Sequence, residues 1–100
     1  MIKHIVLWQL KDEAEGKSKT ENAAAICERL TALKGKIPEL RSIQVGTDVM
    51  HGAGSFDCCL IAEFDSPEAL KVYNDHPLHQ EVLKFIRSVI SSRIACDIEE

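Results

Sequence analysis

The sequence predicts an α+β sandwich of ferredoxin-like βαββαβ order, in which helices cover one side of a single antiparallel sheet. Two patterns predict this fold class. Apolar residues alternate with polar ones over four short segments, which is typical of strands, and recur at three-and-four spacing between them, which is typical of helices. The length of 100 residues fits one domain with a modest core, so we expect residues 1–100 to fold as a single domain.

The first predicted strand spans residues 3–11. Four of its residues share one face: His4, Val6, Trp8 and Leu10. Ile5 and Leu7 lie on the opposite face, because successive side chains of a strand point to opposite sides. This strand is therefore apolar on both faces.

The first predicted helix begins after Ser18. The residues Ser18-Lys19-Thr20-Glu21 match a capping box, in which serine and glutamate satisfy amide groups at the start of a helix. The helical face that follows is formed by Ala23, Ile26, Cys27, Leu30, Leu33 and Ile37. We expect the helix to stop near Pro38 and the charged residues of segment 13–19 to form a solvated loop.

The second and third predicted strands span residues 40–49 and 56–65, and a glycine-bearing segment between them suits a hairpin. The second strand carries alternating apolar residues up to Val49. The third strand has apolar residues on both faces, with Phe56, Cys58, Leu60, Ala62 and Phe64 on one side and Cys59 and Ile61 on the other. Asp57 opens this strand, and we expect it to form a salt bridge with Lys3 or Arg41 at a subunit interface.

Two helical segments and a last strand complete the pattern. Ser66-Pro67-Glu68 combines an N-cap, a proline at the first helical position and an acid in the first turn, which predicts a helix to about Asp75. The His76-Pro77 step interrupts it, because a residue before proline avoids the helical region. A second helical stretch is expected to run to about Ser91, followed by a strand over residues 92–98.

His79 is in phase with the buried stripe of that last helical stretch. The apolar residues on its face are Val82, Leu83, Ile86, Val89 and Ile90, whereas Gln80, Glu81, Lys84 and Arg87 fall on the other face. We expect His79 to point inward from the first turn, where the positive end of the helix dipole disfavours the imidazolium form. A neutral, inward imidazole can accept a proton near neutral pH, so His79 is the best candidate for chemistry.

Two helices can cover only one face of the sheet, yet two strands are apolar on both faces. An uncovered apolar face would be a large exposed patch, and the commonest remedy is an isologous homodimer in which two sheets face each other. We therefore expect a homodimer with Ile5, Leu7 and Ile61 at its interface. The helix-covered side should be the more apolar one, which places His4 and His79 in the same space between sheet and helices.

The composition argues against several classes of function. There are 12 basic and 16 acidic residues, giving a net charge of −4 without a basic run, so we expect no nucleic-acid binding. No apolar run approaches the roughly 20 residues needed to span a bilayer, so we expect no membrane partner and a cytoplasmic location. Cys27, Cys58, Cys59 and Cys96 show no C-x-x-C spacing and are expected to be free thiols.

Several motifs follow one another in a distinctive order and spacing. They are Ile2-Lys3-His4-Ile5-Val6-Leu7, Phe56-Asp57, Glu63-Phe64-Asp65-Ser66, Tyr73 and His76-Pro77-Leu78-His79. Together they resemble the stress-responsive A/B barrel (Dabb) domain over nearly the whole chain. The resemblance implies a dimeric α+β barrel of two ferredoxin-like subunits, in agreement with the count of apolar faces.

The best-understood members of that family are plant polyketide cyclases, which close a linear poly-β-keto thioester by an aldol-type condensation without metal or organic cofactor. The resemblance implies that His79 is the catalytic base, that His4 and Tyr73 support it, and that no cofactor is required. This chain departs from the cyclases at Cys58, where they carry a further pocket histidine. We expect Trp8, Cys58 and Leu60 to line the ligand site.

Three functions remain open for this pocket. Two imidazoles and a phenol in an apolar slot could support proton abstraction beside a carbonyl. The same slot could bind a small, largely apolar ligand without turnover, or His4 and His79 could tie a helix to the sheet in a structural homodimer. A metal site formed by His4, His76 and His79 is disfavoured, because His76 has a capping role and no carboxylate completes the set.

Overall fold

The computed structural model describes residues 1–100, and its elements follow the predicted order with one small addition. The elements are β1 (Ile2–Leu10), β2 (Glu13–Ala14), β3 (Lys17–Ser18), α1 (Lys19–Thr31), β4 (Ser42–Thr47), β5 (Cys58–Phe64), α2 (Pro67–Asp75), α3 (Pro77–Val89) and β6 (Ile90–Glu99). Four strands form one antiparallel sheet in the order β4-β5-β1-β6. This arrangement confirms the ferredoxin-like α+β sandwich.

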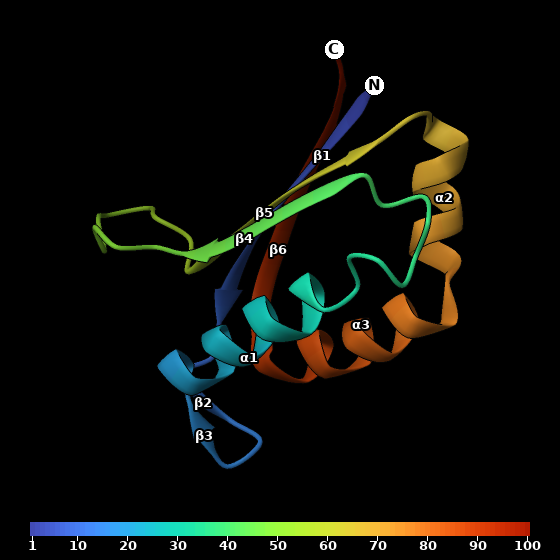
Figure 1. Ribbon diagram of the computed structural model, residues 1–100. Coiled ribbons are helices and arrows are strands. Elements are labelled where there is room, and N and C mark those ends of the chain that lie inside the picture. The colour runs from blue at the N-terminus through green and yellow to red at the C-terminus, as the bar shows by residue number, and fades with distance from the viewer.

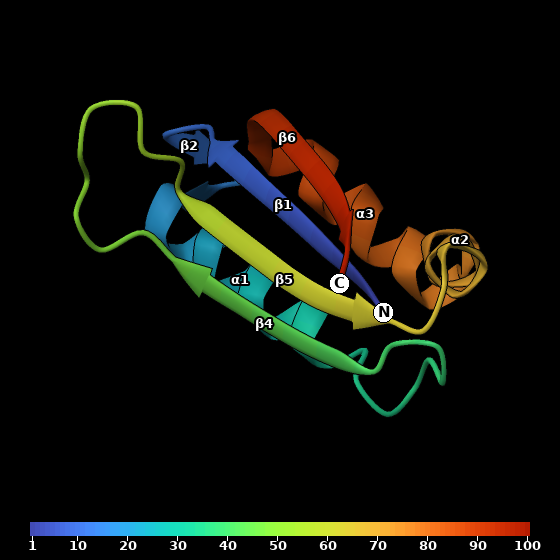
Figure 2. The same cartoon turned by 90° about the horizontal axis from the view of Figure 1, so that it is seen from above.

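The helices lie on one side of the sheet. In Figure 1, α1 and α3 run beneath the strands and α2 stands at one end. Figure 2, seen from above, shows the strands with no element over their other face. The even-numbered residues of β1 are buried and the odd-numbered ones half-buried, which places His4, Val6 and Trp8 on the helix-covered side, as predicted. In β5 the same alternation buries Leu60 and Phe64.

Residues 13–18 form a short hairpin and not the solvated loop expected from their charges. Glu15 and Gly16 join β2 to β3 with φ values of 53° and 73°, which a two-residue type I′ turn requires. The predicted capping box follows at once, because the side chains of Ser18 and Glu21 each accept a hydrogen bond from the other residue's amide at 3.2 Å. A polar hairpin of this length has no apolar alternation that could reveal it.

Helix α1 ends at Thr31, earlier than the expected stop near Pro38. The amides of Leu33 and Lys34 bond to carbonyls three residues back, which tightens the chain into turns, and Gly35 then adopts a φ of 89° that ends any helical path. Leu33 and Ile37 remain buried, because these turns stay against the core. The helical spacing of the apolar residues therefore predicted burial correctly and helix length incorrectly.

Strand β4 is also shorter than expected. Its last pairing joins Thr47 to Cys58, so the chain beyond it has no strand alongside. Val49, predicted to belong to the strand, has 78% of its surface exposed. The loop between β4 and β5 is closed at its base by a hydrogen bond of 2.9 Å from the Asp48 amide to the Asp57 carbonyl.

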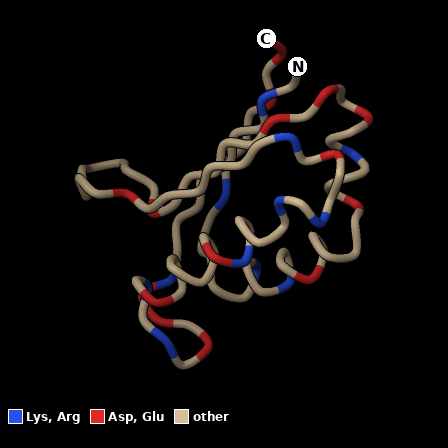
Figure 3. Tube along the Cα trace, in the orientation of Figure 1, with Lys and Arg blue, Asp and Glu red and all other residues tan.

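Acidic and basic residues are interspersed along the chain, without a long run of one sign (Figure 3). Among the ion pairs that join segments distant in sequence, Arg41 contacts Asp65 at 2.8 Å and Lys3 contacts Glu100 at 3.1 Å. No helix is both long enough and apolar enough to cross a bilayer.

Asp57 does not pair with Lys3 or Arg41, contrary to the expectation from the sequence. Its carboxylate accepts a hydrogen bond of 2.7 Å from the Leu10 amide and lies 3.5 Å from the Lys19 ammonium group. Both contacts lie within the protomer. Asp57 therefore joins the end of β1 to the beginning of α1.

We expect Asp57→Ala to lower the free energy of unfolding by about 1–3 kcal/mol, because the partly buried Leu10 amide loses its acceptor. Asp57→Asn keeps an acceptor oxygen and should recover part of the loss. Urea denaturation measures the change. Asp65→Ala, which breaks an exposed pair, is the control and should leave the midpoint almost unchanged. Equal midpoint shifts in the two alanine variants would contradict the role assigned to Asp57.

Candidate functional site

A break between two helices sets the geometry of the site. Helix α2 ends at Asp75, and His76 adopts an extended backbone, with φ −63° and ψ 135°, before Pro77 begins α3. The Nδ1 atom of His76 accepts a hydrogen bond of 3.1 Å from the Leu78 amide and so caps α3. In a continuous helix that amide would bond to the Asn74 carbonyl, which is instead left available.

His79 uses the available carbonyl. Its side chain is buried, with 6% exposed, and its Nδ1 lies 3.1 Å from the Asn74 carbonyl oxygen. A carbonyl oxygen can only accept a hydrogen bond, so Nδ1 carries the hydrogen of the neutral ring and Nε2 carries the lone pair. The Gln80 side-chain amide donates to the same carbonyl. Nε2 of His79, which has no partner in the protein, is the atom that can accept a proton.

The surroundings of His79 lower its pKa from the ordinary value of 6.5. Burial is the largest cause, because the imidazolium form is poorly solvated there. The Asn74 carbonyl acts in the opposite direction, whereas His4, Arg93 and Arg87 add to the lowering. Because its pKa is lowered from 6.5, His79 is neutral near pH 7, as the sequence predicted.

Tyr73 lies against His79. The two ring centroids are 4.2 Å apart, and Tyr73 also packs against Phe64 of β5 at 5.0 Å. The side chain is almost wholly buried, and its hydroxyl has no hydrogen-bond partner. Burial raises the pKa of the phenol, so Tyr73 keeps its proton and can donate it to a hydrogen bond.

His4 faces the same space from the sheet. Its ring stands edge-on to Phe64 with centroids 6.4 Å apart. The register of β1 and β6 pairs His4 with Asp97, whose carboxylate accepts a hydrogen bond from Nδ1 of His4. That contact fixes the orientation of the ring. His4, Tyr73 and His79 thus come together as the sequence predicted.

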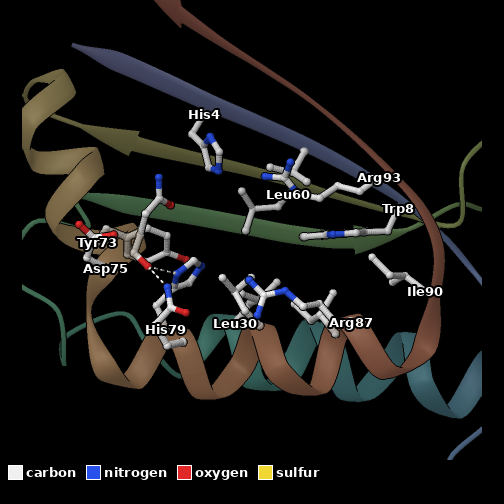
Figure 4. Close-up of a pocket in the computed structure, with 15 residues that line it drawn as sticks. His4, Trp8, Leu30, Leu60, Tyr73, Asp75, His79, Arg87, Ile90 and Arg93 are labelled. Carbon is white, nitrogen blue, oxygen red and sulfur yellow. Dashed lines mark hydrogen bonds between the residues drawn. The ribbon is translucent and has the colours of Figure 1, made fainter.

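These three side chains line a cavity of about 330 Å³ between the sheet and helices α2 and α3 (Figure 4). Trp8 and Leu60 also line it, as predicted. Its apolar wall is completed by Val6, Leu30, Leu83, Ile86 and Ile90. The volume lies at the lower end of the range for small-molecule sites.

Cys58, which was expected to line the ligand site together with Trp8 and Leu60, does not line this cavity. It pairs with Trp8 across β1 and β5, four residues along the strand from the position opposite His4. Four residues of a strand span about 13 Å, which separates the thiol from the histidines. Burial raises the pKa of Cys58 to about 12, with smaller contributions from Cys27 and Asp57, and the thiol stays protonated.

Sequence reasoning missed six polar residues that line or support the cavity: Asn74, Asp75, Gln80, Arg87, Arg93 and Asp97. Arg93 and Asp97 alternate with the apolar residues of β6, and this alternation was the signal that could have placed them on the helix-covered face. Arg87, which the helical pattern assigned to the outer face, lies four residues after Leu83 and reaches the cavity from the edge of the apolar stripe.

Fold and site together define a ferredoxin-like α+β protein with a histidine-lined cavity between its sheet and its helices. The family model of the stress-responsive A/B barrel domain, Dabb, matches residues 2–100, and the chain belongs to this family. An uncharacterised protein of Streptomyces coelicolor is 32% identical over 80 residues, which are 80% of this chain and 80% of the relative.

Solved structures of similar chains are described as dimeric and of unknown function. One, from Bacteroides fragilis, is 30% identical with a TM-score of 0.81, covering 99% of this chain and 95% of that one. Another, from Thermobifida fusca, is 28% identical with a TM-score of 0.83, covering 97% of this chain and 88% of that one. A hydroxynitrile lyase from Passiflora edulis, 19% identical with a TM-score of 0.80 over 97% and 90% of the chains, shares the fold alone.

At about pH 8, the nitrogen chemical shifts of His79 should report the Nδ1–H tautomer, and its titration midpoint should lie below 6.5. The unfolded chain binds this proton more readily than the folded one, so the stability that His79 contributes is present above pH 6.5 and is lost as the pH falls toward the lowered pKa. As the pH is lowered through that range, the melting temperature of His79→Asn should therefore fall less steeply than that of the wild type. An Nε2–H tautomer, or a midpoint of 6.5 or above, would contradict the assigned hydrogen bond.

Proposed function

We propose that the cavity binds a small, largely apolar carbonyl compound and that His79 removes a proton from the carbon beside the carbonyl without a cofactor. The observation that carries this proposal is the tautomer of His79. The Asn74 carbonyl holds Nδ1–H, burial keeps the ring neutral, and the Nε2 lone pair is left as the base of a side chain that lines the cavity.

In the proposed step the C–H bond breaks and its proton moves to Nε2 of His79. The electron pair passes to the carbonyl oxygen, which becomes an enolate oxygen. A hydrogen-bond donor at that oxygen lowers the barrier, because negative charge develops there. The Tyr73 hydroxyl suits this role, since it keeps its proton, lacks another partner and belongs to a ring 4.2 Å from His79.

A second carbonyl in the same ligand would allow the enolate to form a carbon–carbon bond. The enolate carbon attacks that carbonyl carbon, and the imidazolium of His79 returns its proton to the resulting alkoxide, so that atoms and charge balance. His4, oriented by Asp97, lines the cavity from the sheet and offers Nε2 as a further polar contact for such a ligand. The apolar wall limits water near the enolate.

His79→Ala should slow protein-dependent proton exchange at the α-carbon of ketones and β-keto thioesters by roughly two to four orders of magnitude, because the base is lost. Deuterium incorporation followed by NMR, corrected for the buffer reaction, measures the rate. His51→Ala is the matched control, because the His51 side chain is 81% exposed in the loop after β4 and does not line the cavity. The control should retain the wild-type rate.

The same measurement separates catalysis from binding alone. A wild-type protein that binds these compounds without accelerating exchange would be a binding protein, and the catalytic proposal would fail. Equal exchange rates in the wild type and His79→Ala would also refute it. A structural role for His79 would appear instead as a lower melting temperature, without exchange activity in either protein.

We further propose that two copies of the chain pair through the open sheet face. That face carries an apolar stripe across three strands, formed by Ile5, Leu7, Cys59, Ile61, Ile94 and Ile98. Ile94 and Ile98 are 51% and 41% exposed in the protomer, and a surface hollow is lined by Leu7, Ile61 and Ile94. The dimeric Bacteroides and Thermobifida structures support a second copy as the occupant, because isologous pairing covers both apolar faces at once.

Leu7→Asp should convert the dimer to a destabilised monomer, because the interface would bury an unpaired charge at a cost of several kcal/mol. Sedimentation velocity at micromolar concentration measures the mass. Val49→Asp is the control, because Val49 is exposed in a loop outside the open face, and it should stay dimeric. A wild-type protein that sediments as a stable monomer would defeat the proposed dimer.

A further inference from the structure

Two arginines enter the cavity from different elements. Arg87 belongs to α3 and Arg93 to β6, and both line the cavity. In Figure 4 both side chains extend into the cavity, Arg93 on the sheet side near Leu60 and Arg87 on the helix side near Leu30. The two side chains therefore face the same cavity from opposite walls.

Neither guanidinium has a partner. The chain contains four arginines, and the other two are occupied, because Arg29 stacks on the Phe85 ring at 3.9 Å and Arg41 pairs with Asp65. Arg87 and Arg93 are exposed to solvent at the cavity and make no ion pair and no side-chain hydrogen bond within the protein. Each presents N–H groups in a fixed planar fork that matches the oxygens of a carboxylate or phosphate.

A third unsatisfied donor lies beside them. Trp8 pairs with Arg93 in the register of β1 and β6, and its indole lines the cavity. The Trp8 side chain is 3% exposed, and its Nε1–H has no hydrogen-bond partner. Indole nitrogen can only donate, and a buried donor without an acceptor costs free energy. The two arginines are exposed to solvent, so of these three groups only the Trp8 N–H is a buried donor without an acceptor.

The acids of the cavity are placed at its other end. Asp97 pairs with His4 in the register, whereas Arg93 pairs with Trp8, four residues or about 13 Å further along the strands. On α3, Arg87 follows His79 by eight residues, a rise of about 12 Å. Asp75 ends α2 and lies near Tyr73 and His79 in Figure 4. The backbone positions of the histidines and acids therefore lie toward one end of the cavity, and those of the two arginines toward the other.

We propose that Arg87 and Arg93 bind an oxyanion at one end of an amphipathic ligand, whose apolar body lies against the cavity wall and whose other end reaches His79. The ligand is thus a medium-length chain or ring compound with a terminal carboxylate or phosphate. This inference rests on the proposed function for what lies at the His79 end. The binding of the anion itself does not depend on catalysis.

Binding of three probes with one common chain tests the inference: octanoate, octyl phosphate and octan-1-ol, each titrated calorimetrically into the intact protein. The wild type should bind at least one of the two anions more tightly than the alcohol, and the preferred anion distinguishes carboxylate from phosphate recognition. In Arg87→Gln/Arg93→Gln the affinity for that anion should fall roughly 10- to 100-fold, while the affinity for octan-1-ol stays unchanged.

Two matched variants complete the experiment. Arg87→Lys/Arg93→Lys retains the charges without the planar forks and should recover part of the lost affinity. Arg41→Gln removes an arginine outside the cavity and should bind all probes as the wild type does. Equal affinity of the wild type for the anions and the alcohol, no binding of either anion, or an unchanged anion affinity in the glutamine variant would each overturn the inference.

The result is separable from the test of catalysis. The glutamine variant retains His79, Tyr73 and Asn74, so loss of anion binding with a retained His79 tautomer identifies the arginines as a recognition element. If anion binding persists while His79→Ala has no effect on proton exchange, the proposed function fails independently of the anion site.

Discussion

The geometry of the cavity depends on one interrupted helical path, at His76 and Pro77. The proline forces His76 out of the helical conformation, and the His76 ring takes the Leu78 amide that would otherwise bond to Asn74. The Asn74 carbonyl then binds Nδ1 of His79. A single backbone step thereby determines the tautomer of a buried imidazole and which of its nitrogens is available to a ligand.

The strand register of the sheet sets the spacing of the other side chains of the site. The register of β1 places one polar pair, His4 with Asp97, and one aromatic–cationic pair, Trp8 with Arg93, four residues apart. Phe64 of β5 connects the sheet to the helices, because its ring contacts His4 on one side and Tyr73 on the other. The polarity of the cavity therefore follows from strand pairing as much as from the helix that carries His79.

Much of this arrangement follows from the sequence, because periodicity reports which face of an element is buried. The alternation of β1 and the helical phase of His79 were enough to bring His4 and His79 together, whereas Tyr73 was placed there by the family resemblance. Periodicity does not report register or element ends. Cys58 was placed at the site although strand pairing sets it four residues from the position opposite His4, and α1 was extended through turns that bury the same residues.

Sequence patterns do not predict which residues from distant parts of the chain come into contact. Asp97 lies 93 residues from His4, and only the pairing of β1 with β6 connects them. Arg93 and Asp97 are polar positions of a strand that was recognised by its apolar ones. Asn74 contributes its backbone carbonyl, and a pattern of side chains does not predict which carbonyls lose their helical hydrogen bond near a proline.

The edge strand β6 has a consequence for how this cavity can diversify. From Arg93 onward its residues are exposed in the protomer, yet it supplies a charged residue to each end of the site. Exposed positions tolerate substitution with little loss of stability. The charges that select a ligand can therefore change on this strand while the buried core and the His79 base remain as they are, which separates the evolution of specificity from the maintenance of the fold.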